Sequence, residues 1–276
     1  MIDLKYALEA FQDYRKEYPS VERINLKVAH MKRVMKNNIN LARKLNLSID
    51  DVLLAGLIGL LHDLGRFEQV KQYDTFIDSQ SVNHAMLSSE LLFKNGLIRK
   101  FIEDDSYDSI IKSAIENHNR FEIENNLTER EILHSKMIRD SDKADIYIQV
   151  LSSDPKLVFD GPYSENDTIN KKVFVEFMRH HCIKTEDMRC KADDYVRKVA
   201  LIYGFYFPES MELVSSQDLI NRLTNYFKSS FAFINPSTIQ TIDTVNKTAC
   251  EYIQNQLILL SKSTPKNESV ELEERD

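Results

Sequence analysis

Apolar positions repeat with the spacing of an α-helix over most of the chain. In residues 30–47, HMKRVMKNNINLARKLNL, apolar side chains recur every three or four positions and fall on one helix face. No segment alternates as a half-buried strand does, and no internal repeat is present. The pattern therefore predicts an all-α fold. Further helices are predicted near residues 1–20, 84–96, 106–120, 130–151, 215–227 and 237–260.

One predicted helix is apolar nearly all round. Ser48 provides an N-cap, Asp51 follows in the first turn, and residues 52–61 are almost entirely apolar, which indicates a central helix. Gly65 is predicted to end this helix, and a polar loop is predicted over residues 69–83. The most hydrophobic stretch of the chain thus runs directly into an adjacent histidine and aspartate.

Composition narrows the class of protein. The chain has 276 residues with 42% hydrophobic side chains, and only 6 Gly and 6 Pro, which favours long helices. The formal net charge is −7 and no block of lysine and arginine occurs, so no clear nucleic-acid surface is indicated. The first 20 residues do not resemble a signal peptide, residues 52–61 are too short to span a bilayer, and the 3 cysteines show no disulfide spacing. We expect a cytoplasmic protein without a membrane segment, and a homo-oligomer stays open.

Six residues suggest a metal site. Each lies on or at the end of a predicted helix, and a helical bundle can direct such side chains to one centre. Imidazole and carboxylate ligands suit Fe, Mn, Co, Ni or Zn, and carboxylates also suit Mg. The candidate ligands are His30, His62, Asp63, His84, His118 and Asp142.

The order of these residues resembles the signature of the HD-domain superfamily of metal-dependent phosphohydrolases. The segment HDLGR at 62–66 is similar to the superfamily's HDIGK-like segment, and RDSDKAD at 139–145 is similar to its closing aspartate segment. His84 and His118 match the two extra histidines of dinuclear members. The resemblance covers roughly residues 20–150. No Gly-Tyr-Pro segment follows His118, so the chain does not clearly resemble the HD-GYP subgroup, which cleaves cyclic di-GMP.

The resemblance implies both an architecture and an activity. We expect an HD-type metal-binding helical core over 1–155, a C-terminal helical extension over 156–262 packed on it, and a loose tail over 263–276. The activity implied is hydrolysis of a phosphate ester in a nucleotide or a related small phosphorylated metabolite, with one or two divalent ions as cofactor.

Roles for single residues follow from the same resemblance. His30, His62, Asp63 and Asp142 would hold one cation, and Asp63 would bridge to a second cation held by His84 and His118. The expected catalytic residues are Asp63, Arg66 and Glu68, with Glu68 as a candidate proton donor to the leaving group. Arg66 and Lys143 are expected to bind the substrate phosphate.

Other interpretations stay open at this point. A di-iron oxygenase resembling this superfamily would share the six ligands, and a non-catalytic regulator would bind a nucleotide through a retained metal site. His134 is interpreted as a packing or surface residue. Asp140 is interpreted as a supporting or surface charge, and residues 180–182, HHC, do not have zinc-site spacing.

Overall fold

The computed structural model describes residues 2–263, and no β-strand occurs in that part of the chain. The predicted all-α fold is confirmed. The predicted loose tail, apart from Ser263, lies outside the described residues. No helix within residues 2–263 has the length and apolar character needed to cross a membrane.

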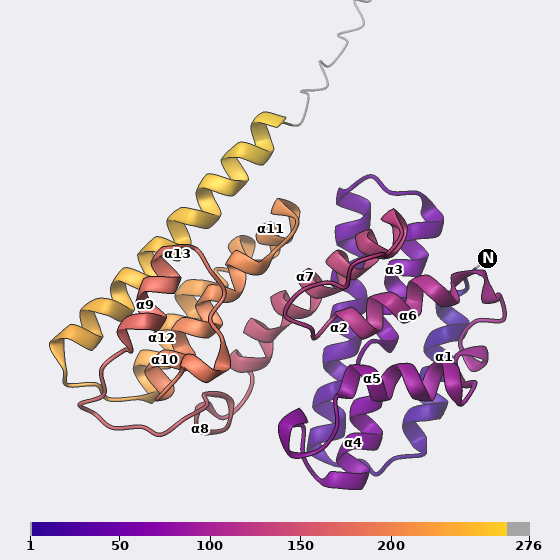
Figure 1. Cartoon of the computed structure of the whole chain (residues 1–276), viewed down its shortest axis with the longest axis horizontal. Helices are drawn as coiled ribbons and strands as arrows, with labels where there is room; N and C mark the ends of the chain where they lie inside the picture. The colour runs from indigo at the N-terminus through magenta and orange to yellow at the C-terminus, as the bar shows by residue number, and fades with distance from the viewer. Residues whose placement is uncertain (1, 264–276) are drawn as a thin grey trace, which may run out of the picture.

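The helices form two lobes that share one long helix, α7 (Figure 1). The N-terminal lobe contains α1 to α6 and the first part of α7. The helices up to α7 are α1 (Leu4–Lys16), α2 (Glu22–Lys44), α3 (Ile49–Leu61), α4 (Gly65–Tyr73), α5 (His84–Ser89), α6 (Asp108–Asn117) and α7 (Glu129–Leu151). Short helical turns lie between them: η1 (Asp78–Gln80), η2 (Glu90–Lys94), η3 (Leu97–Lys100) and η4 (Asp105–Tyr107).

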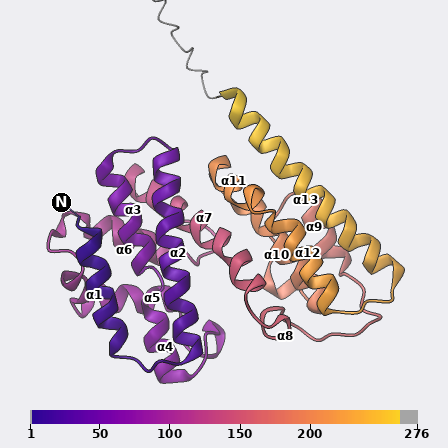
Figure 2. The ribbon, with the colours of Figure 1, turned by 180° about the vertical axis from the view of Figure 1, so that it is seen from behind.

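The C-terminal lobe contains the end of α7 and the helices that follow it. Its helices are α8 (Pro155–Val158), α9 (Lys171–Met178), α10 (Lys191–Val199), α11 (Pro208–Ser216), α12 (Leu219–Ser230) and α13 (Pro236–Ser263), with the turns η5 (Thr185–Asp187) and η6 (Ala200–Gly204). The view from behind shows the same separation into lobes, with α13 on the outer side (Figure 2).

Helix α3 is the centre of the N-terminal lobe, as its apolar sequence predicts. Ser48 caps it, since the Ser48 Oγ accepts the backbone N–H of Asp51 at 3.1 Å. Gly59 lets α2 approach closely, because a Cβ at that position would lie 2.7 Å from the Met35 Cα. Two long helices can therefore cross near the residues that end α3.

Gly65 does not end a helix before a long loop, and that prediction was wrong. Helix α3 ends at Leu61, and Gly65 begins α4, which continues to Tyr73. Glycine is needed here for space, since a Cβ would lie 2.6 Å from the Ser88 backbone nitrogen of α5. The buried ring of Phe67 anchors α4 in the core. The polar loop is consequently shorter than predicted.

Helix α7 joins the two hydrophobic cores. It begins with a capping box in which Thr128 and Glu131 bond each other's backbone N–H groups. Ile138 is buried in the core of the N-terminal lobe, and Tyr147 is buried in the core of the C-terminal lobe. Since both cores pack on this one helix, the division near residue 155 stays a prediction.

The C-terminal lobe contains helices that the sequence pattern did not indicate, namely α9, α10 and α11. Helix α11 begins at Pro208, in the first turn, where proline is well tolerated. The core of the lobe includes stacked rings of Tyr195 and Phe227, whose centroids lie 4.7 Å apart.

Candidate metal centre

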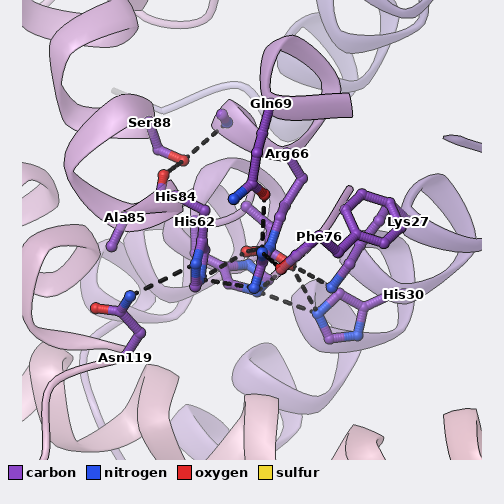
Figure 3. A network of polar contacts seen from close by, with 12 residues as sticks. Lys27, His30, His62, Arg66, Gln69, Phe76, His84, Ala85, Ser88 and Asn119 are labelled. Carbon is purple, nitrogen blue, oxygen red and sulfur yellow. Dashed lines mark hydrogen bonds and ion pairs between the residues drawn. The ribbon is translucent and has the colours of Figure 1, made fainter. Parts of the chain in front are cut away.

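The six predicted ligands meet in the N-terminal lobe, although they come from five helices. His30 lies on α2, His62 and Asp63 directly follow α3, His84 begins α5, His118 directly follows α6, and Asp142 lies on α7. Figure 3 shows the imidazoles of His30, His62 and His84 directed toward one centre. Ligand atoms fall within 4.8 Å of one another in three overlapping groups: His30–His62–Asp63, His62–His118–Asp142 and Asp63–His84–His118.

Each of the four imidazoles uses its Nδ1 atom for an outer hydrogen bond. His62 Nδ1 donates to the Gly59 carbonyl at 2.9 Å, and His118 Nδ1 donates to the Ile115 carbonyl at 2.7 Å. Both acceptors lie three residues earlier, so the end of each helix fixes the orientation of its own histidine. With Nδ1 as the donor, Nε2 is left as an unprotonated ligand atom.

Carboxylates accept the Nδ1 hydrogen bonds of the other two imidazoles and so fix their orientation. His84 Nδ1 donates to Asp78 Oδ2 at 2.6 Å, and His30 Nδ1 donates to Asp145 Oδ2 at 2.7 Å. Asp145 also accepts from Arg33 Nε at 2.6 Å. Neither Asp78 nor Asp145 was among the predicted ligands, but a carboxylate behind a histidine is the usual support of a metal ligand.

The Nε2 atoms form two close pairs. The Nε2 atoms of His30 and His62 are 3.3 Å apart, and those of His84 and His118 are 3.0 Å apart. Two nitrogen lone pairs repel at such distances unless a proton or a cation lies between them. The donor set therefore fits divalent transition metals.

Asp63 lies between the two pairs. Its Oδ2 is 3.4 Å from His30 Nε2, and its Oδ1 is 3.3 Å from His84 Nε2. Asp142 Oδ1 joins the first pair, at 3.2 Å from His30 Nε2 and 3.6 Å from His62 Nε2. Asp63 Oδ1 is buried and has no hydrogen-bond partner, which is costly for a carboxylate oxygen unless it binds a cation. The arrangement fits two neighbouring cations that share Asp63.

Asp63 and His84 favour the protonation states that bind metal. Burial opposes ionisation of Asp63, but the Lys27 ammonium and the surrounding imidazoles hold its pKa well below the usual range. Burial lowers the pKa of His84 to about 4, despite the carboxylates of Asp78 and Asp63. His30 behaves differently: burial and Lys27 lower its pKa, but hydrogen bonds to three carboxylates outweigh them and raise it to about 9. The surroundings of His30 therefore attract positive charge.

Lys27 belongs to the centre but was not among the residues predicted from the sequence. Its Nζ lies 2.7 Å from Asp63 Oδ2, and its side chain is 14% exposed. The available signal was its position one turn before His30 on the same helix. Phe76 lies beside it (Figure 3). The centroid of the Phe76 ring is 5.6 Å from Lys27 Nζ and 5.7 Å from Arg66 Cζ.

Arg66 lies beside the cluster, as expected, and also organises the following loop. Its Nη1 donates to the Phe76 carbonyl at 2.6 Å and to Asp78 Oδ1 at 2.9 Å. Its Nε has no hydrogen-bond partner and lies 3.6 Å from Asp63 Oδ1. Gln69 Nε2 donates to the same Asp78 oxygen at 3.0 Å. Arg66 therefore connects the loop to the cluster.

The structure does not bring Glu68 to the cluster. Its carboxylate accepts from Tyr18 Oη at 3.0 Å and from Gln72 Nε2 at 2.7 Å, on the side of α4 toward α1. These hydrogen bonds and Lys71 lower its pKa although burial raises it, so the carboxylate is ionised near neutral pH. A paired carboxylate in this position is not suited to the expected role of proton donor.

Lys143 also points elsewhere, toward the C-terminal lobe. Its Nζ donates to the Gly204 carbonyl at 2.7 Å. Successive residues of an α-helix point about 100° apart, which explains why the neighbour of Asp142 does not face the centre. The expectation that Lys143 binds the substrate is therefore not supported by its contacts.

Asp140 joins the two lobes. It is fully buried and accepts the backbone N–H groups of Tyr206 and Phe207, each at 2.9 Å, and the Ser210 hydroxyl at 2.8 Å. These bonds satisfy the N-terminal end of α11. Asp140 is thus a structural residue, and Asp142 is the member of this segment that reaches the cluster.

His134 is buried away from the cluster and bonds Asp51, with Nε2 and Oδ1 3.0 Å apart. At 180–182, His181 pairs with Glu176, and Cys182 Sγ donates to the Ala200 carbonyl at 3.7 Å. Within residues 2–263, no possible metal group includes these side chains. Both segments have structural contacts, in line with the sequence interpretation.

A helical bundle with buried imidazoles and carboxylates at one centre defines a class of metal-binding all-α proteins. Residues 28–147 match the model of one family in this class, the HD domain, so this part of the chain is an HD domain. The HD superfamily consists generally of metal-dependent phosphohydrolases. No curated protein and no solved structure matches the chain.

Proposed function

We propose that the protein is a metal-dependent phosphohydrolase that cleaves a phosphate ester in a nucleotide or a related small phosphorylated metabolite. The observation that carries the proposal is the pair of positively charged side chains, Lys27 and Arg66, beside Asp63. Lys27 Nζ lies at one carboxylate oxygen and Arg66 Nε near the other, and both side chains are largely buried. Two buried cations beside a metal centre suit an anionic substrate better than molecular oxygen.

The proposed ligands form two sets. His30, His62, Asp63 and Asp142 would hold one divalent ion, and Asp63, His84 and His118 would hold a second. When bound, divalent ions in such a cluster supply Lewis acidity that polarises a phosphate ester and activates water near neutral pH. The metal remains open among Fe, Mn, Co, Ni, Zn and Mg.

The neighbouring residues orient the metal ligands or bind the substrate. Asp78 and Asp145 keep the imidazoles of His84 and His30 in the tautomer that presents Nε2 to the centre. Arg66 offers its free Nε, and Lys27 its ammonium, to the phosphate oxygens of the substrate. Each charged hydrogen bond to phosphate is worth about 1.5–3 kcal/mol.

A metal-dependent activity screen tests the proposal. The purified protein is stripped with a chelator, reloaded separately with Mn, Fe, Co, Ni, Zn or Mg, and assayed for phosphate release. The substrates are nucleoside mono-, di- and triphosphates, sugar phosphates and p-nitrophenyl phosphate. We expect phosphate release only after reloading. Binding of nucleotides without turnover would indicate the regulator, and oxygen consumption without phosphate release would indicate the di-iron oxygenase.

A further inference from the structure

A cavity of about 410 Å³ lies between the lobes, apart from the metal centre. Its walls come from α2, α7 and α11, and Figures 1 and 2 both show α11 between α13 and the N-terminal lobe. The volume lies within the range of small-molecule sites, roughly 300–1,000 Å³. Leu41, Ala144 and Leu213 give it an apolar surface.

One polar group in the wall is unsatisfied. Asn37 lines the cavity, and its side-chain nitrogen is buried without a hydrogen-bond partner. Two hydroxyls of the wall are already paired, since Ser141 Oγ donates to Asn38 Oδ1 at 3.0 Å and Ser210 Oγ donates to Asp140 Oδ2 at 2.8 Å. A buried amide donor without a partner costs free energy, so this group suits a ligand that supplies an acceptor.

The two sides of the cavity carry opposite charges. Arg43 and Lys44 lie on α2, and Glu209 and Glu212 lie on α11. Lys44 and Glu212 form an ion pair across the cavity. Arg43 and Glu209 have no ion-pair partner among residues 2–263, which leaves one positive and one negative charge on opposite walls.

We propose that this cavity binds a small zwitterion with an apolar body, of the chemistry of an aliphatic α-amino acid. Its carboxylate pairs with Arg43, its ammonium pairs with Glu209, and its side chain covers Leu41 and Leu213. A zwitterion pairs with both walls, whereas a simple anion or a simple cation pairs with one wall and faces a like charge on the other. The site is independent of the proposed hydrolase activity.

Calorimetric titration of the full chain tests the proposal with L-leucine as the probe. L-leucinamide, which lacks the carboxylate, and 4-methylpentanoate, which lacks the amine, are the matched single-charge compounds. We expect L-leucine to bind and each analogue to bind at least about 10-fold more weakly, the loss of one charge-assisted contact. No binding of L-leucine, or equal binding of either analogue, would overturn the zwitterion.

Variants locate the site. Arg43→Gln and Glu209→Gln should each weaken L-leucine binding by about 10-fold. Leu213→Trp should abolish it by filling the cavity. Lys247→Gln, an exposed charge on α13, is the matched control and should leave binding unchanged. Circular dichroism verifies that each variant is folded. If folded Leu213→Trp binds L-leucine as the wild type does, the ligand binds elsewhere and the proposal is wrong.

Discussion

Lys27 Nζ lies 2.7 Å from Asp63 Oδ2, the oxygen that also faces the His30 imidazole at 3.4 Å. The lysine thus places a fixed positive charge at an oxygen expected to bind a cation. A positive charge at this position opposes the binding of a metal ion to the same oxygen and favours the binding of a phosphate group. Removing Lys27 should therefore strengthen metal binding and weaken phosphate binding.

Lys27→Met should raise the affinity for the divalent ion and lower kcat/KM for phosphate release by about 10-fold or more, since one charged contact to phosphate is lost. Competition with a fluorescent chelator measures the affinity, and the phosphate assay measures kcat/KM. Lys71→Met, which removes a cation that contacts Glu68 on α4, is the control and should change neither quantity. A fall in both quantities would indicate that Lys27 mainly holds the centre together.

Arg66→Ala should lower kcat/KM by about 10- to 150-fold, the equivalent of one charged hydrogen bond to phosphate, and leave at least the His30–His62 ion bound. Arg66→Lys should recover part of the activity because it restores the charge without the planar fork. Steady-state kinetics with the best substrate of the screen gives the values. An unchanged kcat/KM in Arg66→Ala would restrict Arg66 to organising the loop through Phe76 and Asp78.

Two buried carboxylates, Asp63 at the metal centre and Asp140 on α7, should respond differently to substitution by asparagine. Asp63→Asn should lose most bound metal, because the shared negative charge disappears. Asp140→Asn should retain metal but unfold at lower urea, because the amide has one acceptor oxygen fewer for the N–H and O–H groups at the start of α11, and one hydrogen bond is typically worth about 1 kcal/mol. Elemental analysis after dialysis and urea denaturation measure the two properties. Metal loss in Asp140→Asn but not in Asp63→Asn would contradict the assignment.

Asp78→Asn should reduce the metal content from two ions toward one. Asp78 orients His84, and loss of such a support typically weakens metal binding by about 10- to 100-fold. The ion at His30 and His62 should stay, because Asp145 supports that side. Asp74→Asn, in the same loop but paired with Arg23, is the control. Metal titration followed by elemental analysis decides, and equal metal content in both variants would contradict the role of Asp78.

Helix periodicity predicted the all-α fold, and the motif order predicted all six residues that meet at the centre. Both signals are local or come from a family resemblance. Lys27 was missed because its partner Asp63 is 36 positions away and contact depends on how α2 crosses α3. Helices α9 and α10 were missed because they are only 8 and 9 residues long, too short for a clear periodic pattern.

The expected roles of Glu68 and Lys143 show a second limit. Both lie within a few residues of a ligand, but a helix turns its neighbours to other faces. Glu68 pairs with Tyr18, 50 positions earlier, and Lys143 bonds Gly204, 61 positions later. Proximity in sequence therefore did not decide proximity to the centre, whereas the motif register of Asp142 did distinguish it from Asp140 and Asp145.

The buried pair of His134 and Asp51 should make stability depend on pH. Burial lowers the pKa of His134, and the hydrogen bond to Asp51 does not compensate. Its Nδ1 is buried without a partner, so protonation would leave an unsatisfied N–H. Below the unfolded pKa of about 6.5, the unfolded chain takes up a proton that the folded chain refuses. The contribution of neutral His134 to the free energy of unfolding is therefore fully present above about pH 6.5 and decreases as the pH falls through that value.

His134→Gln tests this linkage, because the glutamine amide can still donate to Asp51 but does not titrate. We expect the free energy of unfolding of the wild type to fall more steeply than that of His134→Gln as the pH is lowered from about 7.5 to about 5. Urea denaturation at several pH values gives both curves. His181→Gln, at an exposed histidine paired with Glu176, should keep the wild-type dependence. Parallel curves for the wild type and His134→Gln would show that His134 titrates alike in the folded and unfolded chains, and its burial would then carry no pH-dependent cost.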